Sequence, residues 1–147
     1  MYFDVDLPEK KRPDWKKFEN DVADIFEQFG YNVERDIQFK TSARFQIDLI
    51  AYDERICFFV DCKDHSYIPP AGEETFILKQ KIRADNYITL RPELAYKKKI
   101  VLLVTRNKTS SLLNHTESVG KVLGVDINAL ADLLKNVDLY LNELYIV

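Results

Sequence analysis

The segment FFVDCKDHS, residues 58–66, joins a buried strand to charged residues at its end. The apolar run from 56 to 60 leads directly into Asp61, Lys63 and Asp64. No glycine or proline separates the two parts to mark a surface loop. Because charges are costly inside a protein, the end of this strand needs either solvent or a function for its side chains.

The preceding predicted strand, FQIDLIAY at residues 45–52, also holds a single carboxylate, Asp48, within an apolar run. A tight hairpin centred on Glu54 and Arg55 joins the two strands and sets Asp48 opposite Asp61. The same-face pairs are then Tyr52 with Cys57, Ile50 with Phe59, Asp48 with Asp61, and Gln46 with Lys63.

Two carboxylates about 5 Å apart repel each other unless one is neutral or a cation lies between them. A hard divalent ion such as Mg²⁺ suits oxygen ligands of this kind. Two alternatives remain open. The first is that both aspartates simply lie at a solvent-exposed edge of the sheet. The second is that the hairpin register slips by one residue, because Glu-Arg is not a favoured turn pair.

The composition is that of one globular domain, residues 1–147, with residues 1–12 as an extended N-terminal segment. No apolar run is long enough to cross a membrane and the N-terminus lacks a basic start, so we expect a cytoplasmic, intracellular protein. A structural zinc site is not expected, because the chain has only two cysteines, Cys57 and Cys62, which do not form a CxxC pair, and only two histidines. A net charge of −3 does not by itself indicate nucleic-acid binding.

The first part of the chain predicts one helix followed by three strands. Apolar residues recur at helical spacing over residues 15–29, Pro13 marks the start, and Gly30 suits the C-terminal cap. After Gly30 the spacing of apolar residues changes from a helical to a strand pattern, and three adjacent strands are expected in an antiparallel meander. They are residues 33–39, whose apolar side chains should share one face, 45–52 and 56–63.

The second part predicts helices alternating with strands. Residues 67–72 (YIPPAG) suit a loop, and a helix from about Glu73 to Thr89 ends before Pro92. Strands are expected at 100–105, covered on both faces, and at 122–127. The final helix carries the stripe Leu130, Leu133, Leu134, Val137, Leu141 and Leu144. The resulting α/β order, αβββαβ and then a short strand and helix, describes a central mixed β-sheet flanked by helices.

A third carboxylate, Glu19, lies at the edge of the first helix's apolar stripe, one turn from Trp15 and Val22. It therefore points toward the sheet more than the other polar residues of that helix do. A boundary residue making a surface ion pair is the alternative reading of Glu19 alone.

Glu19, Asp48 in QIDLIAY, and residues 61–63 (DCK) together resemble the PD-(D/E)XK nuclease superfamily, in particular its Mrr-like restriction and archaeal Holliday-junction-resolvase-like branches. The resemblance covers residues 13–135, because the αβββαβ order also matches that family's restriction-endonuclease-like core. It implies a DNA endonuclease that uses Mg²⁺, with Mn²⁺ substituting. Asp61 stands where many members carry Glu, and the acidic balance differs from that of the strongly basic resolvases.

The resemblance also implies a role for each residue of the motif. Asp48 and Asp61 bind the metal, with the backbone carbonyl of Cys62 as a further ligand, and Glu19 binds it through water or takes a second ion. Lys63 orients or deprotonates the attacking water, or stabilises the transition state; the sequence leaves these open.

Weaker candidates for contacts with DNA are Lys40, Ser42, Arg44, Gln80 and Lys81. An ordinary hairpin connection explains Lys40, Ser42 and Arg44 equally well, and a solvated helix face is the favoured reading of Gln80 and Lys81. Two basic clusters, residues 10–12 and 97–99, are further candidates for phosphate contacts, with a solubilising surface as the alternative.

Two other functions compete with the simple endonuclease. One is a structure-specific resolvase acting as a homodimer, and the other is a catalytically idle nuclease-like subunit that binds DNA or a protein. The chain is too short for a separate sequence-reading domain, so strict target recognition would need a partner subunit.

Overall fold

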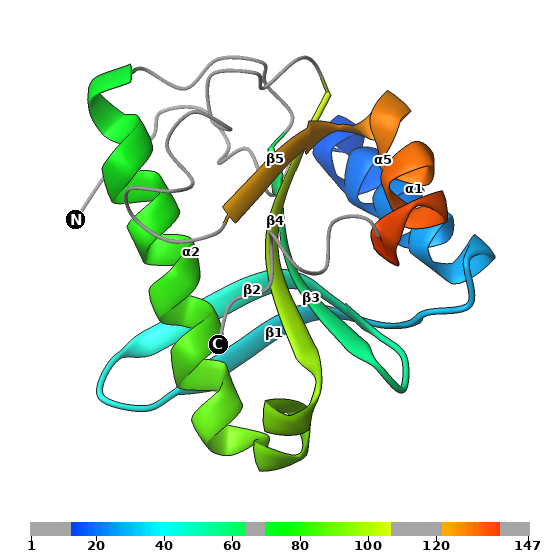
Figure 1. The fold of residues 1–147 in the computed structure, drawn as a ribbon. Helices are drawn as coiled ribbons and strands as arrows, with labels where there is room; N and C mark the ends of the chain where they lie inside the picture. Colours follow the sequence, from blue (N-terminus) through cyan, green and yellow to red (C-terminus); the bar gives the residue numbers. More distant parts are fainter. Residues whose placement is uncertain (1–12, 64–69, 107–121, 139–147) are drawn as a thin grey trace.

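The computed structural model describes residues 13–63, 70–106 and 122–138, which form a five-stranded sheet flanked by helices (Figure 1). In chain order the elements are α1 (Pro13–Gln28), β1 (Asn32–Lys40), β2 (Arg44–Tyr52), β3 (Ile56–Lys63), α2 (Pro70–Leu90), the 3₁₀ helix η2 (Pro92–Tyr96), β4 (Lys98–Thr105), β5 (Val122–Asp126) and α5 (Ile127–Lys135).

The strands lie in the order β1-β2-β3-β4-β5. The first three are antiparallel neighbours, whereas β3, β4 and β5 run parallel to one another. The predicted α/β fold class, with a mixed sheet and three leading antiparallel strands, is therefore confirmed. No helix in the described segments is both long and apolar enough to span a bilayer.

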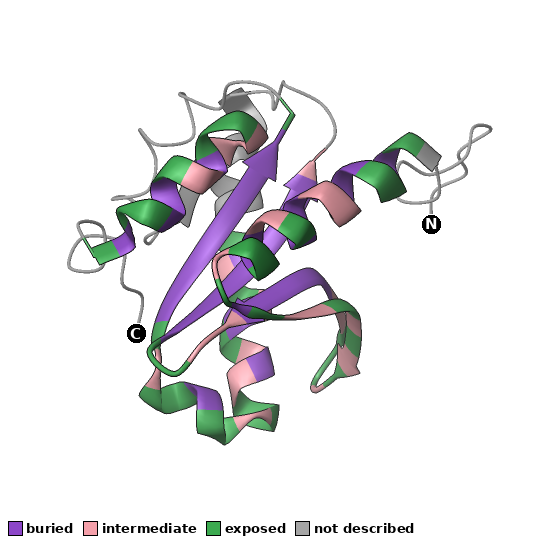
Figure 2. Cartoon of the chain, turned by 90° about the vertical axis from the view of Figure 1, so that its right-hand side faces the viewer, coloured by how far each residue is buried: buried purple, intermediate pink, exposed green. Residues whose placement is uncertain are grey.

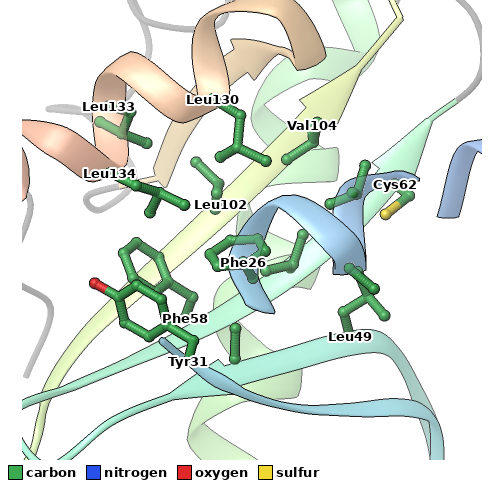
Figure 3. Close-up of a cluster of buried hydrophobic side chains, with 14 of the residues drawn as sticks. Phe26, Tyr31, Leu49, Phe58, Cys62, Leu102, Val104, Leu130, Leu133 and Leu134 are labelled. Atoms are coloured by element: carbon green, nitrogen blue, oxygen red, sulfur yellow. The ribbon is translucent and has the colours of Figure 1, made fainter. Parts of the chain in front are cut away.

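The helices form two layers, with α1 and α5 on one face of the sheet and α2 on the other (Figure 1). Buried residues are concentrated in the central strands and on the sheet-facing sides of the helices (Figure 2). Under α1, the rings of Phe26, Tyr31 and Phe58 meet with centroids 5.2 to 5.8 Å apart (Figure 3). These aromatic contacts fix α1 on the first face of the sheet.

Helix α1 ends as the sequence predicts. Gly30 has φ +87°, and the Tyr31 N–H donates to the Phe26 carbonyl at 3.2 Å. A left-handed residue at this position is the usual way to end a helix, and glycine adopts it without strain. The chain then reverses directly into β1.

The β2–β3 hairpin has the predicted register, with Tyr52 opposite Cys57 and Ile50 opposite Phe59. Asp53 stabilises the turn, because its Oδ1 accepts hydrogen bonds from the backbone N–H groups of Arg55 and Ile56, each at 2.8 Å. An aspartate that bonds the backbone two residues ahead favours a turn that the dipeptide alone does not. The ladder pairs run from Tyr52–Cys57 to Leu49–Val60, so Asp48–Asp61 and Gln46–Lys63 lie beyond them.

The prediction that the apolar side chains of β1 share one face is wrong. Val33 packs against the cluster under α1, whereas Ile37 and Phe39 pack against the cluster under α2. Asp36, which lies between them, has φ +49°. A left-handed residue inside a strand turns the following side chains onto the other face, and aspartate tolerates this conformation better than most residues.

The loop predicted at 67–72 is wrong from Pro70 onward, because α2 begins there; residues 67–69 lie outside the described segments. Proline suits the first turn of a helix, where its missing N–H would have no intrahelical partner. The helix ends at Leu90, before Pro92, as predicted, and η2, which follows it, was not predicted.

The later elements follow the predicted pattern. Every residue of β4 after Lys98 is buried, as expected of a strand covered on both faces. Helix α5 buries Leu130, Leu133 and Leu134 against the sheet. Leu141 and Leu144 of the predicted stripe lie outside the described segments.

Candidate active site

Asp48 lies where the side chains of β2 change faces. Ile47 packs on the α2 side and Leu49 on the α1 side, although residues two apart in a regular strand share a face. The Asp48 side chain is buried, and its Oδ2 accepts a hydrogen bond from the Cys62 backbone N–H at 2.9 Å. This bond attaches the Asp48 carboxylate to the peptide group that follows Asp61.

Asp61 is also buried, and two cationic side chains lie near its carboxylate. Lys63 Nζ is 3.9 Å from Asp61 Oδ2, and Arg83 Nη1 is 3.7 Å from Asp61 Oδ1. The contact with Lys63 agrees with the predicted alternation, which places both side chains on one face of β3. Protein cations therefore balance part of the charge at the end of this strand.

Helix α2 supplies further polar neighbours of Asp61. Gln80 is buried, and its Oε1 accepts a hydrogen bond from Arg83 Nη1 at 3.2 Å. Both residues line a small recess together with Asp61. The suggestion that Gln80 reaches the site agrees with this position, whereas sequence reasoning did not select Arg83. Its spacing of three residues from Gln80 on a helix was the available signal.

Glu19 approaches the site from α1. Its side chain is buried, and its Oε1 lies 3.1 Å from the Nζ of the exposed Lys16. Burial raises the pKa of Glu19, and the nearby carboxylate of Asp48 raises it further, whereas the Lys16 ammonium opposes both effects. The predicted position of Glu19, facing the sheet, agrees with this burial.

Helices on both faces of the sheet bring charged side chains toward Asp48 and Asp61. Glu19 comes from α1, and Arg83 contacts Asp61 from α2. Asp48 accepts a hydrogen bond from the Cys62 backbone N–H of β3. Within the described segments, no three His, Cys, Asp or Glu side chains lie close enough together to hold a metal ion. The arrangement therefore offers the Asp48 carboxylate bonded to the peptide group that follows Asp61, with Glu19 close enough to Asp48 for that carboxylate to raise its pKa.

The weaker candidates around the β1–β2 hairpin lie near α2. Thr41 Oγ1 donates to Asn86 Oδ1 at 2.8 Å, which ties the hairpin tip to the helix. Arg44 lines a cavity of about 610 Å³ between hairpin and helix, and Lys40 lines an adjoining one. Ser42 is exposed, and Lys81 is half-buried on α2.

The basic cluster at 97–99 lies at the far end of the sheet from Asp61. Lys98 is paired with Ile56 beside the β2–β3 turn, whereas the other end of β4 is paired with Lys63. Lys99 is buried and donates to the carbonyl groups of Ala95 and Lys97, at 3.0 and 2.9 Å. Lys99 therefore stabilises the fold at that end, and the distance of the cluster from Asp61 argues against phosphate contacts near the site. Residues 10–12 lie outside the described segments.

Comparison with known proteins found no matching family model and no matching curated protein. Solved structures do match. The small subunit of the heterodimeric restriction endonuclease R.BspD6I aligns with a TM-score of 0.52 and 13% identity, over 88% of this chain and 74% of that subunit. This chain has a restriction-endonuclease-like fold.

Two further structures share the fold. Protein VC1899 from Vibrio cholerae aligns with a TM-score of 0.54 and 13% identity over 90% of this chain, and AF1548, a protein of unknown function, with 0.50 and 14% over 73%. The chain spans only 37% and 57% of those two proteins, respectively. At these identities the likeness concerns the fold alone.

Proposed function

We propose that this protein is a divalent-metal-dependent DNA endonuclease that hydrolyses phosphodiester bonds in the manner of the PD-(D/E)XK superfamily. The observation that carries the proposal is the bond from the Cys62 N–H to Asp48 Oδ2. It links the buried Asp48 carboxylate of β2 to the peptide group that follows the buried Asp61 on the adjacent strand β3, with Lys63 beside Asp61. The restriction-endonuclease-like fold supports a nuclease relationship at a coarser level.

The donor set fits Mg²⁺, with Mn²⁺ as a substitute. Mg²⁺ prefers oxygen ligands and keeps several of its waters, so two carboxylates and one backbone carbonyl suffice as protein ligands. We assign these to Asp48, Asp61 and the Cys62 carbonyl, with Glu19 acting through water. When bound, such an ion supplies Lewis acidity to the phosphodiester and lowers the pKa of a neighbouring water.

The protein's own cations have complementary roles in this proposal. Lys63 lies close enough to Asp61 to hold a water in place, accept its proton, or stabilise negative charge on the phosphate. Arg83 lies 3.7 Å from the other oxygen of Asp61 and balances part of the charge of that carboxylate. Both side chains are partly exposed, so a phosphate can reach them.

The test is cleavage of plasmid and duplex DNA with Mg²⁺ or Mn²⁺ by wild type, Asp61→Asn and Lys63→Met. The exposed pair Lys17 and Asp21, 3.2 Å apart on α1, offers matched controls as Lys17→Met and Asp21→Asn. We expect each site variant to lose about 10²-fold or more in rate, the usual effect of removing an acid–base or electrostatic group, and both controls to keep it. Equal activity in all four variants with unchanged melting temperatures would refute the proposal.

A second candidate function is that of a subunit in a larger complex. One structure with this fold is the small subunit of a heterodimeric restriction endonuclease, and the present chain covers 74% of it. A partner subunit would then supply target recognition, and the present chain would cleave or only bind. A folded protein that cleaves no duplex, flap, junction or single strand with either metal would favour the idle, binding form.

The finer assignment to an Mrr-like or a resolvase-like branch is a separate part of the proposal. A resolvase would act as a symmetric homodimer on four-way junctions. Light scattering of the purified protein, together with a comparison of junction and duplex cleavage, distinguishes the two branches. A monomer without preference for junctions would exclude the resolvase.

A further inference from the structure

A cavity of about 610 Å³ lies between the β1–β2 hairpin and α2. Its lining consists of three cationic, two amide and two apolar side chains, with no acidic one among the described residues. They are Arg44, Lys79 and Arg83, Gln38 and Gln46, and Phe45 and Ile82. This composition suits phosphates, which pair with the cations, and the edges of bases, which pair with the Gln38 amide; the Gln46 amide donates to Asp36 Oδ1 at 2.7 Å.

An aromatic platform borders this cavity. Phe45 is stacked on its cross-strand neighbour Phe39, with centroids 5.3 Å apart and an interplanar angle of 24°. Tyr87 of α2 supports Phe39 from behind, with centroids 5.0 Å apart. Both phenylalanine rings are only half-buried, so they are held in place and remain accessible.

The platform is continuous with a second recess of about 280 Å³. Gln38, Arg44 and Phe45 line both spaces, and Phe39 and Lys40 complete the second. Cationic side chains and two stacked phenylalanine rings thus line one groove. Exposed bases stack on such rings, whereas the bases of an intact duplex are stacked on each other and unavailable.

Arg83 connects this groove to the carboxylates. It lines the larger cavity, and it also lines the small recess beside Asp61, with its Nη1 3.7 Å from Asp61 Oδ1. We infer that the groove binds an unpaired nucleic-acid strand and brings one of its phosphates past Arg83 to Asp61. The delivery of a phosphate to Asp61 rests on the proposed nuclease function, whereas the binding of the strand in the groove does not.

The test measures binding alone, by fluorescence anisotropy of the full chain in EDTA. The probes are a labelled deoxyribo-oligonucleotide, the ribo-oligonucleotide of the same sequence, and the blunt DNA duplex. We expect at least one of the two single strands to bind more tightly than the duplex. Comparing the deoxyribo- and ribo-oligonucleotides then shows whether the groove prefers DNA or RNA. A duplex bound as tightly as both strands would overturn the inference.

Variants separate the stacking contribution from the charge contribution. Phe45→Leu keeps an apolar side chain but removes the ring, so we expect binding to weaken roughly five- to hundredfold with an unchanged salt dependence, and Phe45→Tyr to restore it. Arg44→Ala and Lys79→Ala should each reduce the slope of log affinity against log salt by about 0.7. Lys17→Ala, an exposed cation on α1, serves as the control.

The outcomes also separate this inference from the nuclease proposal. Strand binding by a wild type that never cleaves with Mg²⁺ or Mn²⁺ supports the groove and refutes the nuclease. Phe45→Leu and Arg44→Ala proteins that stay folded and bind the strand like wild type overturn the groove, even if DNA is cleaved. An equal loss in Lys17→Ala overturns it as well, since binding would then reflect charge in general.

Discussion

If the proposed metal ion binds at Asp61, Arg83 competes with it for that carboxylate. Its Nη1 is 3.7 Å from Asp61 Oδ1, so a divalent ion bound at that oxygen must displace the guanidinium or tolerate its repulsion. Arg83→Met keeps an unbranched stem of similar length and removes the charge. We therefore predict that this variant binds Mn²⁺ more tightly than the wild type does.

The size of the effect follows from the geometry. Two unit charges about 4 Å apart interact by about 4 kcal/mol at an effective dielectric constant near 20. The Arg83 side chain is 30% exposed and the separation exceeds a hydrogen bond, so water screens most of this energy. Measured values for such pairs are about 1 kcal/mol at most, which corresponds to a roughly fivefold lower Kd for Mn²⁺.

The assay is titration calorimetry with MnCl₂ on the protein without DNA. Arg55→Met is the control, because Arg55 pairs with the exposed Asp138, 3.0 Å away at the opposite end of the hairpin strands. An unchanged or higher Kd in Arg83→Met, with measurable binding by wild type, would refute the competition. Weaker binding would show instead that Arg83 orients the carboxylate for the metal.

Three further predictions concern stability. In the folded protein the pKa of buried Glu19 is raised above its ordinary value of 4.5, so ionising this carboxyl lowers the stability as the pH rises through that range. In EDTA, Glu19→Gln should therefore melt at a higher temperature than wild type at pH 7 and at the same temperature at acidic pH. A lower melting temperature of Glu19→Gln at pH 7 would contradict this. Phe58→Ala removes a fully buried ring and should cost about 3–5 kcal/mol in urea unfolding, and a loss below about 1 kcal/mol would show that the cluster under α1 is not packed as described. Burial raises the pKa of the Cys57 thiol to about 12, so at pH 8 it should react with a thiol reagent only as fast as the protein unfolds; rapid labelling of native protein would disprove it.

Local patterns were sufficient to predict most of the helices and strands and the faces on which several site residues lie. The period-2 alternation of β3 placed Asp61 and Lys63 on one face, and the register of Tyr52 opposite Cys57 followed from a two-residue turn. Helical spacing placed Glu19 against the sheet. Each of these depends on a few neighbouring residues and on fixed backbone geometry.

Other features depend on contacts between distant segments. The left-handed conformation of Asp36 and the change of faces at Asp48 arise where two strands distort together, and an aspartate in a strand does not reveal this by itself. The contact of Arg83 with Asp61 depends on how α2 crosses the sheet. The periodicity of α2 is weak, so the sequence did not indicate which side faces the carboxylates.

Because the side chains change faces at Asp36 and Asp48, the β1–β2 hairpin packs against the helices on both sides of the sheet. Val33 and Leu49 lie under α1, whereas Ile37 and Ile47 lie under α2. Neither helical layer can detach without uncovering half of the same two strands. Melting of the two layers is therefore coupled, and the protein should unfold in a single cooperative transition, with the same midpoint by circular dichroism and by fluorescence of Trp15.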